Sequence, residues 1–413
     1  MRRTTYREIT GQYIGFYGLM AGLGVLILLS LAAAWHMEHQ GHHVTGMTNQ
    51  IVWGMPHVLA IFLIVAASGA LNVASIGTVF GRTWYKPLGR LSGLLALALL
   101  VGGLAVLVLD LGRADRILVA MTTYNFKSIF AWNIYLYTGF MAVVVVYLWV
   151  QMERRMNRFA PAAGLVAMIW RLVLTTGTGS IFGFLVARQA YDAAVMAPLF
   201  IAMSLSLGLA CFNLTLAATC RGTDLELGDG LVSRLGRLLG VLAAVVLYFT
   251  AVQHLANLYA AEHAGIERFI LLEGGVFTAL FWLGQVVLGG LVPIALVFTL
   301  PAGRALGRVL LASILVFLGG IAQIYVIVIG GQAYPLVLFP GKEVQSSFFD
   351  GVVMSYAPSW PEITLGVGGF AMAAVIVMVG LRALRFLPES LADAALDPHH
   401  SAAPTGAEEK APA

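Results

Sequence analysis

The sequence has few charged residues and almost no cysteine. Lysine, arginine, aspartate and glutamate make up 11% of its 413 residues, whereas a soluble domain carries about 25%. So little charge excludes a water-soluble fold for most of the chain, and 60% hydrophobic residues indicate a protein that lies in lipid. The two cysteines, Cys211 and Cys220, fall in or beside one apolar run, which excludes a disulfide framework and a CxxC metal site.

Ten apolar runs divide the chain, and charged residues, glycine, proline or aromatic residues bound each of them. A helix needs roughly 20 residues to cross a bilayer, and these runs are long enough to do so. They cover residues 13–35, 53–79, 89–110, 129–151, 163–186, 193–219, 236–258, 269–300, 307–330 and 363–386. The sequence therefore predicts an all-α, polytopic integral membrane protein with about ten transmembrane helices.

The basic residues predict the orientation of these helices. Under strict alternation most arginines and lysines fall on the side of the N-terminus, and few fall on the other side, among them Arg113, Lys127 and Arg268. By the positive-inside rule we expect both termini in the cytoplasm and the chain in a bacterial inner membrane. The net charge of +4 is then a topology signal, and we expect no nucleic acid partner.

Two segments differ in composition from the apolar runs. Residues 387–413 are rich in alanine, proline and glutamate, and they predict a disordered cytoplasmic tail. Residues 330–362, on the outer side, are rich in tyrosine, phenylalanine, tryptophan and proline but poor in charge. This composition indicates packed structure that lies on the membrane or beneath a partner protein.

Polar residues follow one face of the second run, WGMPHVLAIFLIVAASGALNVASI. Their offsets of 11, 4 and 3 residues keep four side chains on the same side of a helix: His57, Ser68, Asn72 and Ser75. Small residues lie between them, so we expect the last three to serve close packing inside a bundle.

His57 has a different setting, because it lies about one turn inside the outer interface. A neutral imidazole can donate one hydrogen bond and accept another, which suits a quinone carbonyl or a quinol hydroxyl. The alternative interpretation is an interfacial histidine that is hydrogen-bonded to a loop carbonyl.

Other ionisable residues within the runs are functional candidates, because charge in hydrocarbon is costly. Asp110 ends the third run in VLDLGRADR, where a structural ion pair with Arg113 and a place on a proton path are both compatible with the sequence. For His254 and Glu273, near the outer ends of two later runs, a proton path and a buried hydrogen-bonded network remain open. We expect Arg171, near an inner helix end, to extend its side chain to the membrane surface.

Histidine spacing limits the haem and metal sites that the chain can offer. A bis-histidine haem within the membrane needs two histidines at matching depth, and His57 and His254 are the one such pair. The sequence thus leaves room for one haem but not for two. The histidine-rich segment 36–43 has no carboxylate or thiolate support beyond Glu38, so we expect no metal there.

Three stretches of the sequence resemble the NrfD/polysulfide reductase family of membrane subunits: PHVLAIFLIVAASGALNVASI, YKPLGRLSGLLALALLVGGLAVLVLDLGRADR and MTTYNFKSIFAWNIYLY. The resemblance is best over residues 47–140, and the ten-span layout is similar to a longer branch of the family, the DsrP subunits of sulfur-metabolism complexes. LDLGR and NFKSIFAWN are its most specific elements. The resemblance implies a transmembrane domain over residues 1–386, arranged as two bundles plus extra helices.

The resemblance further implies a subunit that exchanges electrons between the quinone pool and a periplasmic iron–sulfur (ferredoxin-like) partner. Its cofactor would be menaquinone or ubiquinone, with haem and clusters carried by other subunits of the complex and none in this chain. Family quinone sites lie at the outer face of the first bundle and use histidine, asparagine and tyrosine. By position, the matching residues here are His57, Asp110, Tyr124 and Asn125.

The sequence leaves three competing functions open. A secondary transporter or ion channel also combines ten helices with buried charges, although no repeated halves stand out. A single-haem membrane b-type cytochrome would use the two matched histidines. A plain anchor would only tether its partners. In each case we expect the chain to be incomplete as an enzyme by itself.

Overall fold

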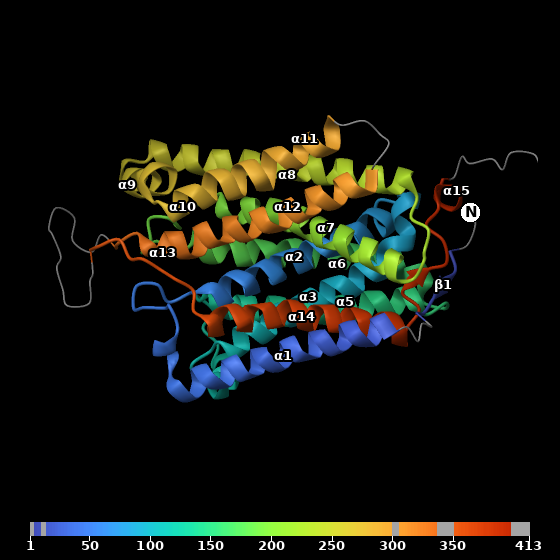
Figure 1. Ribbon diagram of the computed structural model, residues 1–413, viewed down its shortest axis with the longest axis horizontal. Coiled ribbons are helices and arrows are strands. Elements are labelled where there is room, and N and C mark those ends of the chain that lie inside the picture. The colour runs from blue at the N-terminus through green and yellow to red at the C-terminus, as the bar shows by residue number, and fades with distance from the viewer. Residues whose placement is uncertain (1–3, 10–13, 300–304, 337–350, 398–413) are drawn as a thin grey trace, which may run out of the picture.

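The computed structural model describes residues 4–9, 14–299, 305–336 and 351–397. Within these ranges ten helices are long and apolar enough to cross a membrane, which confirms the predicted all-α polytopic fold. The long helices run side by side along the length of the molecule (Figure 1). A helix bonds its own backbone N–H and C=O groups, which is the condition for a segment to lie in hydrocarbon.

The elements are bounded as follows. The first part of the chain forms β1 (Tyr6–Arg7), α1 (Ile14–Gln40), η1 (His42–Val44), α2 (Met55–Thr78), η2 (Thr83–Leu88), α3 (Gly89–Leu109), η3 (Ala114–Arg116), α4 (Ile117–Thr122), α5 (Ile129–Met152), η4 (Asn157–Phe159) and α6 (Ala160–Gly183). The second part forms α7 (Met196–Gly222), α8 (Asp229–Tyr259), η5 (Ala261–His263), α9 (Ala264–Arg268), η6 (Phe269–Glu273), α10 (Val276–Ala279), η7 (Leu280–Leu291), α11 (Val292–Phe298), α12 (Ala305–Tyr325), η9 (Val326–Gly330), α13 (Gly331–Ala333), α14 (Trp360–Ala383), β2 (Leu387–Pro388) and α15 (Asp393–Leu396).

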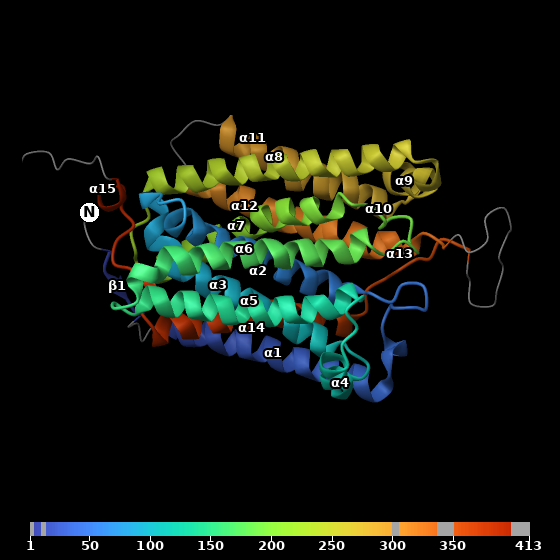
Figure 2. The same ribbon diagram turned by 180° about the vertical axis from the view of Figure 1, so that it is seen from behind.

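The helices form two bundles with an added pair. In the first bundle α2, α3, α5 and α6 pack in a ring, and in the second α7, α8, η7 and α12 do the same. Contact between α2 and α7 joins the two bundles, while α1 packs on α14, which lies against α2 and α3 (Figures 1 and 2). This arrangement is the predicted one of two bundles plus extra helices.

Glycines set the distance between the two bundles. A methyl group on Gly69 of α2 would meet the backbone carbonyl of Ser204 in α7, and one on Gly208 of α7 would meet the backbone of Gly69 and Ala70. Small residues let helix backbones approach closely in lipid, where dispersion contacts replace the hydrophobic effect as the force for association. The crossing of α2 and α7 therefore depends on these two residues.

The polar face of α2 packs inside the first bundle, as its small residues indicate. Ser68 donates a hydrogen bond to the carbonyl of Arg171 at 3.1 Å, and the Arg171 guanidinium donates to the Asn72 side chain at 2.8 Å. Ser75 is buried and bonds back to its own helix at Leu71. The expected extension of Arg171 to the membrane surface is wrong: its side chain is buried because α6 lies directly against α2.

The first and last described segments meet at one end of the molecule. β1 and β2 pair antiparallel, with Tyr6 opposite Pro388, next to α15 (Figure 1). Residues 387–397 therefore do not belong to a disordered tail, because Leu387, Leu391 and Leu396 are buried there. Residues 398–413, the rest of that predicted tail, lie outside the described residues, as do residues 337–350 of the long outer segment.

Candidate functional site

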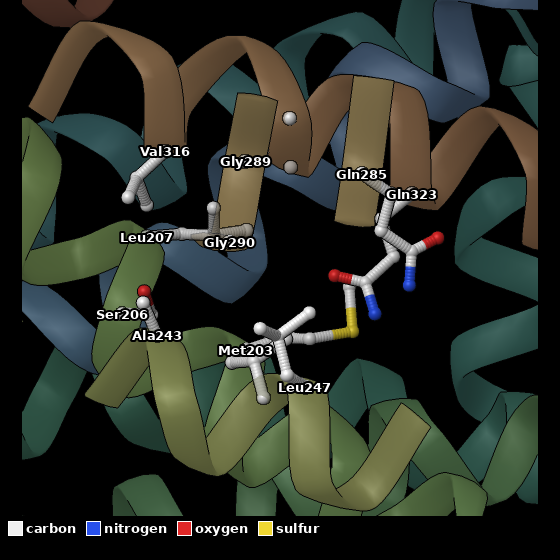
Figure 3. Close-up of a pocket in the computed structure, with 13 residues that line it drawn as sticks. Met203, Ser206, Leu207, Ala243, Leu247, Gln285, Gly289, Gly290, Val316 and Gln323 are labelled. Atoms are coloured by element: carbon white, nitrogen blue, oxygen red, sulfur yellow. The ribbon is translucent and has the colours of Figure 1, made fainter. Parts of the chain in front are cut away.

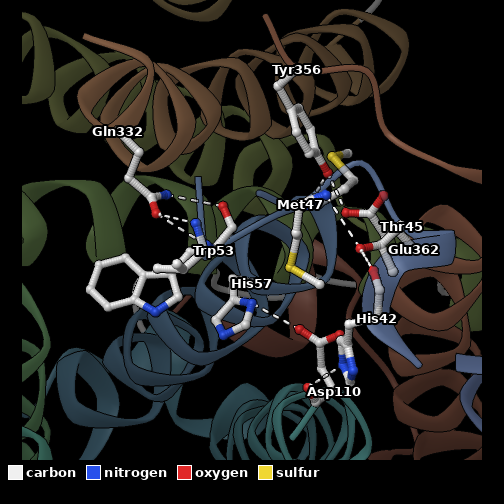
Figure 4. Close-up of polar contacts among 11 residues, drawn as sticks. His42, Thr45, Met47, Trp53, His57, Asp110, Gln332, Tyr356 and Glu362 are labelled. Carbon is white, nitrogen blue, oxygen red and sulfur yellow. Dashed lines mark hydrogen bonds and ion pairs between the residues drawn. The ribbon is translucent and has the colours of Figure 1, made fainter. Parts of the chain in front are cut away.

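The helix that carries His57 starts at the end of the molecule opposite β1 and β2. Pro56 occupies its first turn, where a missing N–H costs nothing. The preceding loop is held by Gln332, whose Oε1 accepts from the backbone N–H groups of Val52 and Trp53 at 2.9 and 3.0 Å (Figure 4). The Gln332 amide also donates to the Trp53 carbonyl at 3.0 Å, so all the polar atoms of one buried side chain fix the entry to α2.

A second buried group holds the same helix start. The Met55 N–H donates to the Tyr356 hydroxyl at 2.7 Å, and that hydroxyl donates to Glu362. The second carboxylate oxygen of Glu362 accepts from the backbone of Gly46 and Ser359, each at 2.8 Å. Burial, together with the hydrogen bond to Glu362, raises the pKa of Tyr356. Sequence reasoning missed this group, although Ser359-Trp-Pro-Glu362 carries the S-x-x-E pattern of a capping box.

His57 and Asp110 form a pair at the centre of the site. The His57 Nδ1 lies 2.9 Å from Asp110 Oδ2, and the two side chains are 21% and 1% exposed. The approach is close but its hydrogen-bond geometry is bent, since the pair does not meet angular criteria. Asp110 follows the last turn of α3, so two neighbouring helices of the first bundle each supply one partner.

The surroundings of this pair leave one side of the imidazole open. The ring of Trp53 stacks on His57 with centroids 6.3 Å apart, and Phe130 of α5 lies 5.9 Å from the same indole. On the other side, His42 Nε2 is 3.2 Å from the backbone carbonyl of Asp110. Within the described part of the chain, Nε2 of His57 makes no hydrogen bond, and it points away from Asp110 (Figure 4).

The predicted ion pair between Asp110 and Arg113 is wrong. Arg113 lies beyond the end of α3 with an exposed side chain, and it pairs with Asp115 at 2.8 Å. The Arg113 hydrogen bond lowers the pKa of Asp115. Asp110 points instead into the bundle, toward the start of the neighbouring helix, because the turn after α3 separates its direction from that of Arg113.

Tyr124 and Asn125 lie in the connection between α4 and α5. Tyr124 packs edge-on against Phe126, Trp132 and Tyr135, and its hydroxyl is enclosed without a hydrogen-bond partner in the described residues. Asn125 accepts from the Lys127 N–H at 3.0 Å, which is a turn-forming role. The structure thus joins His57 and Asp110 directly, but gives the other two predicted residues partners of their own.

A second histidine–carboxylate pair lies in the second bundle. His254 Nδ1 is 2.6 Å from Glu267 Oε2, and the Asn257 amide donates to the other Glu267 oxygen at 2.8 Å. Glu267 is 1% exposed. Glu273 is different, since it lies at the surface and pairs with Arg268 at 2.6 Å. Sequence reasoning missed Glu267; its position between the apolar residues Ile266 and Phe269 was the available signal.

Two small cavities continue inward from His254. One, of about 20 Å³, is lined by His254, Gln253, Gln285 and Gln323 among others. Another of the same size shares Gln285 and Gln323 and reaches Ser206 on its far side (Figure 3). Each cavity has room for about one water molecule, and the amide and hydroxyl groups on their walls can bond to it. The interior of the second bundle is therefore polar along part of its length.

The two histidines that matched in depth lie in separate bundles. His57 faces Trp53, whereas His254 packs edge-on against Phe281 with centroids 4.7 Å apart. In the histidine-rich segment, His39 contacts the Trp35 carbonyl at 3.2 Å. Among the described residues, histidine, cysteine, aspartate and glutamate side chains form no group of three or more that could hold a metal.

Comparison with known proteins agrees with this architecture. Residues 43–335 match the family described as polysulphide reductase, NrfD. The integral membrane subunit of the Hdr-like menaquinol oxidoreductase of Archaeoglobus fulgidus is 30% identical over 387 residues, covering 93% of this chain and 97% of that one. A polysulfide reductase polypeptide of Wolinella succinogenes is 26% identical over 311 residues, covering 69% and 96%. A selenate reductase polypeptide of Mesobacillus selenatarsenatis is 23% identical, covering 84% and 88%. The chain therefore belongs to the NrfD/polysulfide reductase family and is a membrane subunit of the kind found in quinone-linked electron-transfer complexes.

Proposed function

We propose that the His57–Asp110 pair is the site at which this subunit binds a quinone or quinol head group. The observation that supports it most directly is a buried carboxylate at Nδ1 of a partly exposed histidine. This arrangement holds the neutral ring with its proton on Nδ1, and it leaves Nε2 as an acceptor toward the lipid side. The Archaeoglobus relative is named as part of a menaquinol oxidoreductase, which makes a menaquinol the first substrate to test.

The pair can handle the proton that a quinol loses on oxidation. Nε2 of His57 accepts a hydrogen bond from the quinol hydroxyl and then its proton, while Asp110 stabilises the imidazolium that results. Oxidation releases two electrons and two protons, and the electrons pass to an iron–sulfur partner. In the opposite direction the same groups donate protons to a quinone. Tyr124, with its hydroxyl unpartnered in the described residues, would bond the head group if the turn before α5 closed on it.

Proton transfer across the membrane is a further part of the proposal, with Asp110, His254 and Glu273 as the predicted path. The His254–Glu267 pair supports the path better than Glu273 does, because Glu267 is buried and borders the polar interior. The surface ion pair of Glu273 leaves it only the outer entrance. A path in the second bundle would then be separate from the quinol site in the first.

The partner is proposed to lie over the end that carries His57. Large apolar side chains of α4 and α5 are exposed there: Leu118, Val119, Phe126, Phe130 and Trp132. A periplasmic iron–sulfur protein in that place would receive electrons near His57, and other membrane and haem-carrying subunits would complete the complex. The proposal includes an inner-membrane location with cytoplasmic termini, and a role in sulfur metabolism like that of the DsrP branch.

The test is quinol-dependent electron transfer in the intact complex. We expect His57→Gln to lower the rate of cluster or haem reduction by a menaquinol analogue by about 10²-fold or more, the usual contribution of a general base. His39→Gln, on the exposed end of α1, is the matched control and should leave the rate unchanged. An unchanged rate in His57→Gln would favour a plain anchor.

Two other measurements separate the remaining alternatives. Solute or ion flux in proteoliposomes that contain this chain alone would support a transporter or channel instead. A haem spectrum in the purified chain that disappears in His57→Ala would support a b-type cytochrome.

A further inference from the structure

A large apolar cavity lies far from the His57 site. It measures about 530 Å³ and is enclosed by α1, α3, α7 and α14. Phe16 at the start of α1, Thr223 after α7 and Leu381 near the end of α14 line its mouth, so it opens at the end that carries β1 and β2 (Figure 1). None of the residues proposed for quinol or proton chemistry lines it.

The walls of the cavity exclude water. Most of its lining is aliphatic or aromatic, including Leu95, Leu99 and Val377. Its inner end is closed by Phe317 and Phe370, whose ring centroids lie 5.6 Å apart. An apolar cavity of about 150 Å³ in a soluble protein stays dry and takes up benzene. This one is more than three times as large, and its walls belong to helices that span the membrane.

The side of the cavity between α1 and α7 faces the lipid. α1 packs on α14, and on the other side α7 packs on α2, α6, α8 and α12. Leu19 of α1 and Ala218 of α7 both line the cavity and are both exposed. A hydrocarbon chain from the bilayer can therefore enter sideways and replace the dispersion contacts that empty space lacks.

Basic side chains surround the mouth of the cavity. Arg7 donates a hydrogen bond to the carbonyl of Thr223 at 3.2 Å, and the Arg382 guanidinium lies 5.4 Å from the centroid of the Phe16 ring. Thr223 and Phe16 both line the cavity. The nearby carboxylate of Glu8 is directed to Arg385, 3.6 Å away. The mouth is thus positively charged at the depth where helices end and lipid head groups begin.

We infer that this cavity binds one chain of an anionic phospholipid, with the phosphate beside Arg7 and Arg382. The apolar walls fix the class of the buried part, and the charge of the rim fixes the class of the head group. A zwitterionic phospholipid would fill the same walls but gain less from the arginines. Such a lipid would tie α1 and α14 to α7 of the second bundle.

The test measures phospholipid that stays with the protein after extensive detergent washing, by mass spectrometry of the full chain purified from membranes. We expect retained phospholipid that is enriched in phosphatidylglycerol or another anionic class. Ala218→Trp should reduce it by about tenfold, the effect of losing roughly 1.4 kcal/mol. Ala32→Trp places the same ring on an exposed site of α1 outside the cavity, and retention should not change.

A second pair of variants keeps the test decisive if the tryptophan disturbs folding. In nanodiscs that mix phosphatidylglycerol and phosphatidylcholine, Arg7→Gln with Arg382→Gln should lower the preference for the anionic lipid by about fivefold per arginine. Arg237→Gln, an exposed arginine of α8, is the control. Equal retention in Ala218→Trp and the wild type, an unchanged preference in the arginine variant, or an isoprenoid quinone retained in place of the phospholipid would each overturn the inference.

Discussion

The substitution Asp110→Asn tests the charge of the buried carboxylate and keeps its shape. An imidazolium and a carboxylate 2.9 Å apart attract each other by about 6 kcal/mol at an effective dielectric constant near 20, and by about 1.4 kcal/mol in bulk water. Asp110 is buried and His57 is one-fifth exposed, so the loss lies between these values. Since about 1.4 kcal/mol is tenfold in rate, we expect quinol oxidation to slow by about 10²- to 10³-fold.

The assay is steady-state oxidation of a menaquinol analogue by the intact complex, with the maximal rate and the Michaelis constant measured separately. The maximal rate should fall more than the Michaelis constant rises, because Asp110 acts on the protonated ring that forms during the reaction and not on the neutral one. Asp115→Asn removes an exposed carboxylate from the same connection and should change the rate by less than about twofold. Wild-type kinetics in Asp110→Asn would refute the role of the pair.

Three further predictions concern stability, read as thermal unfolding of the purified protein in detergent. Gly208→Leu should destabilise by about 3 kcal/mol because the side chain would enter the backbone of α2, whereas Gly22→Leu on α1 has open space and should be neutral; equal melting temperatures would contradict the close crossing. Glu267→Ala should cost about 3–5 kcal/mol by leaving His254 and Asn257 without their buried partner, and Glu273→Ala less than about 1 kcal/mol; the reverse order would show that Glu267 is not the buried anchor. Tyr356→Phe should cost about 1–3 kcal/mol through the two groups it leaves unpaired. Because the folded pKa of this tyrosine is raised, its contribution is complete below about pH 10 and falls as the pH rises further, so only the wild type should lose this stability at alkaline pH.

The sequence alone determined the membrane fold and much of its detail. Long apolar runs can satisfy their backbone only as helices, so the ten spans and their approximate limits follow from composition. The small polar residues of α2 could be assigned to packing because their spacing keeps them on one helical face. His57 could be singled out because an ionisable group near the start of a span is rare.

The tertiary structure decided which groups meet. Asp110 and Arg113 are three residues apart, but the turn after α3 sends them in different directions, and His57 of another helix becomes the partner of Asp110. The choice between Glu267 and Glu273 likewise depends on which side of a short helix faces the bundle. Local sequence spacing does not specify such contacts between separate helices, because they are set by how the helices pack. The same holds for the cavity between α1 and α7, whose walls come from four distant segments.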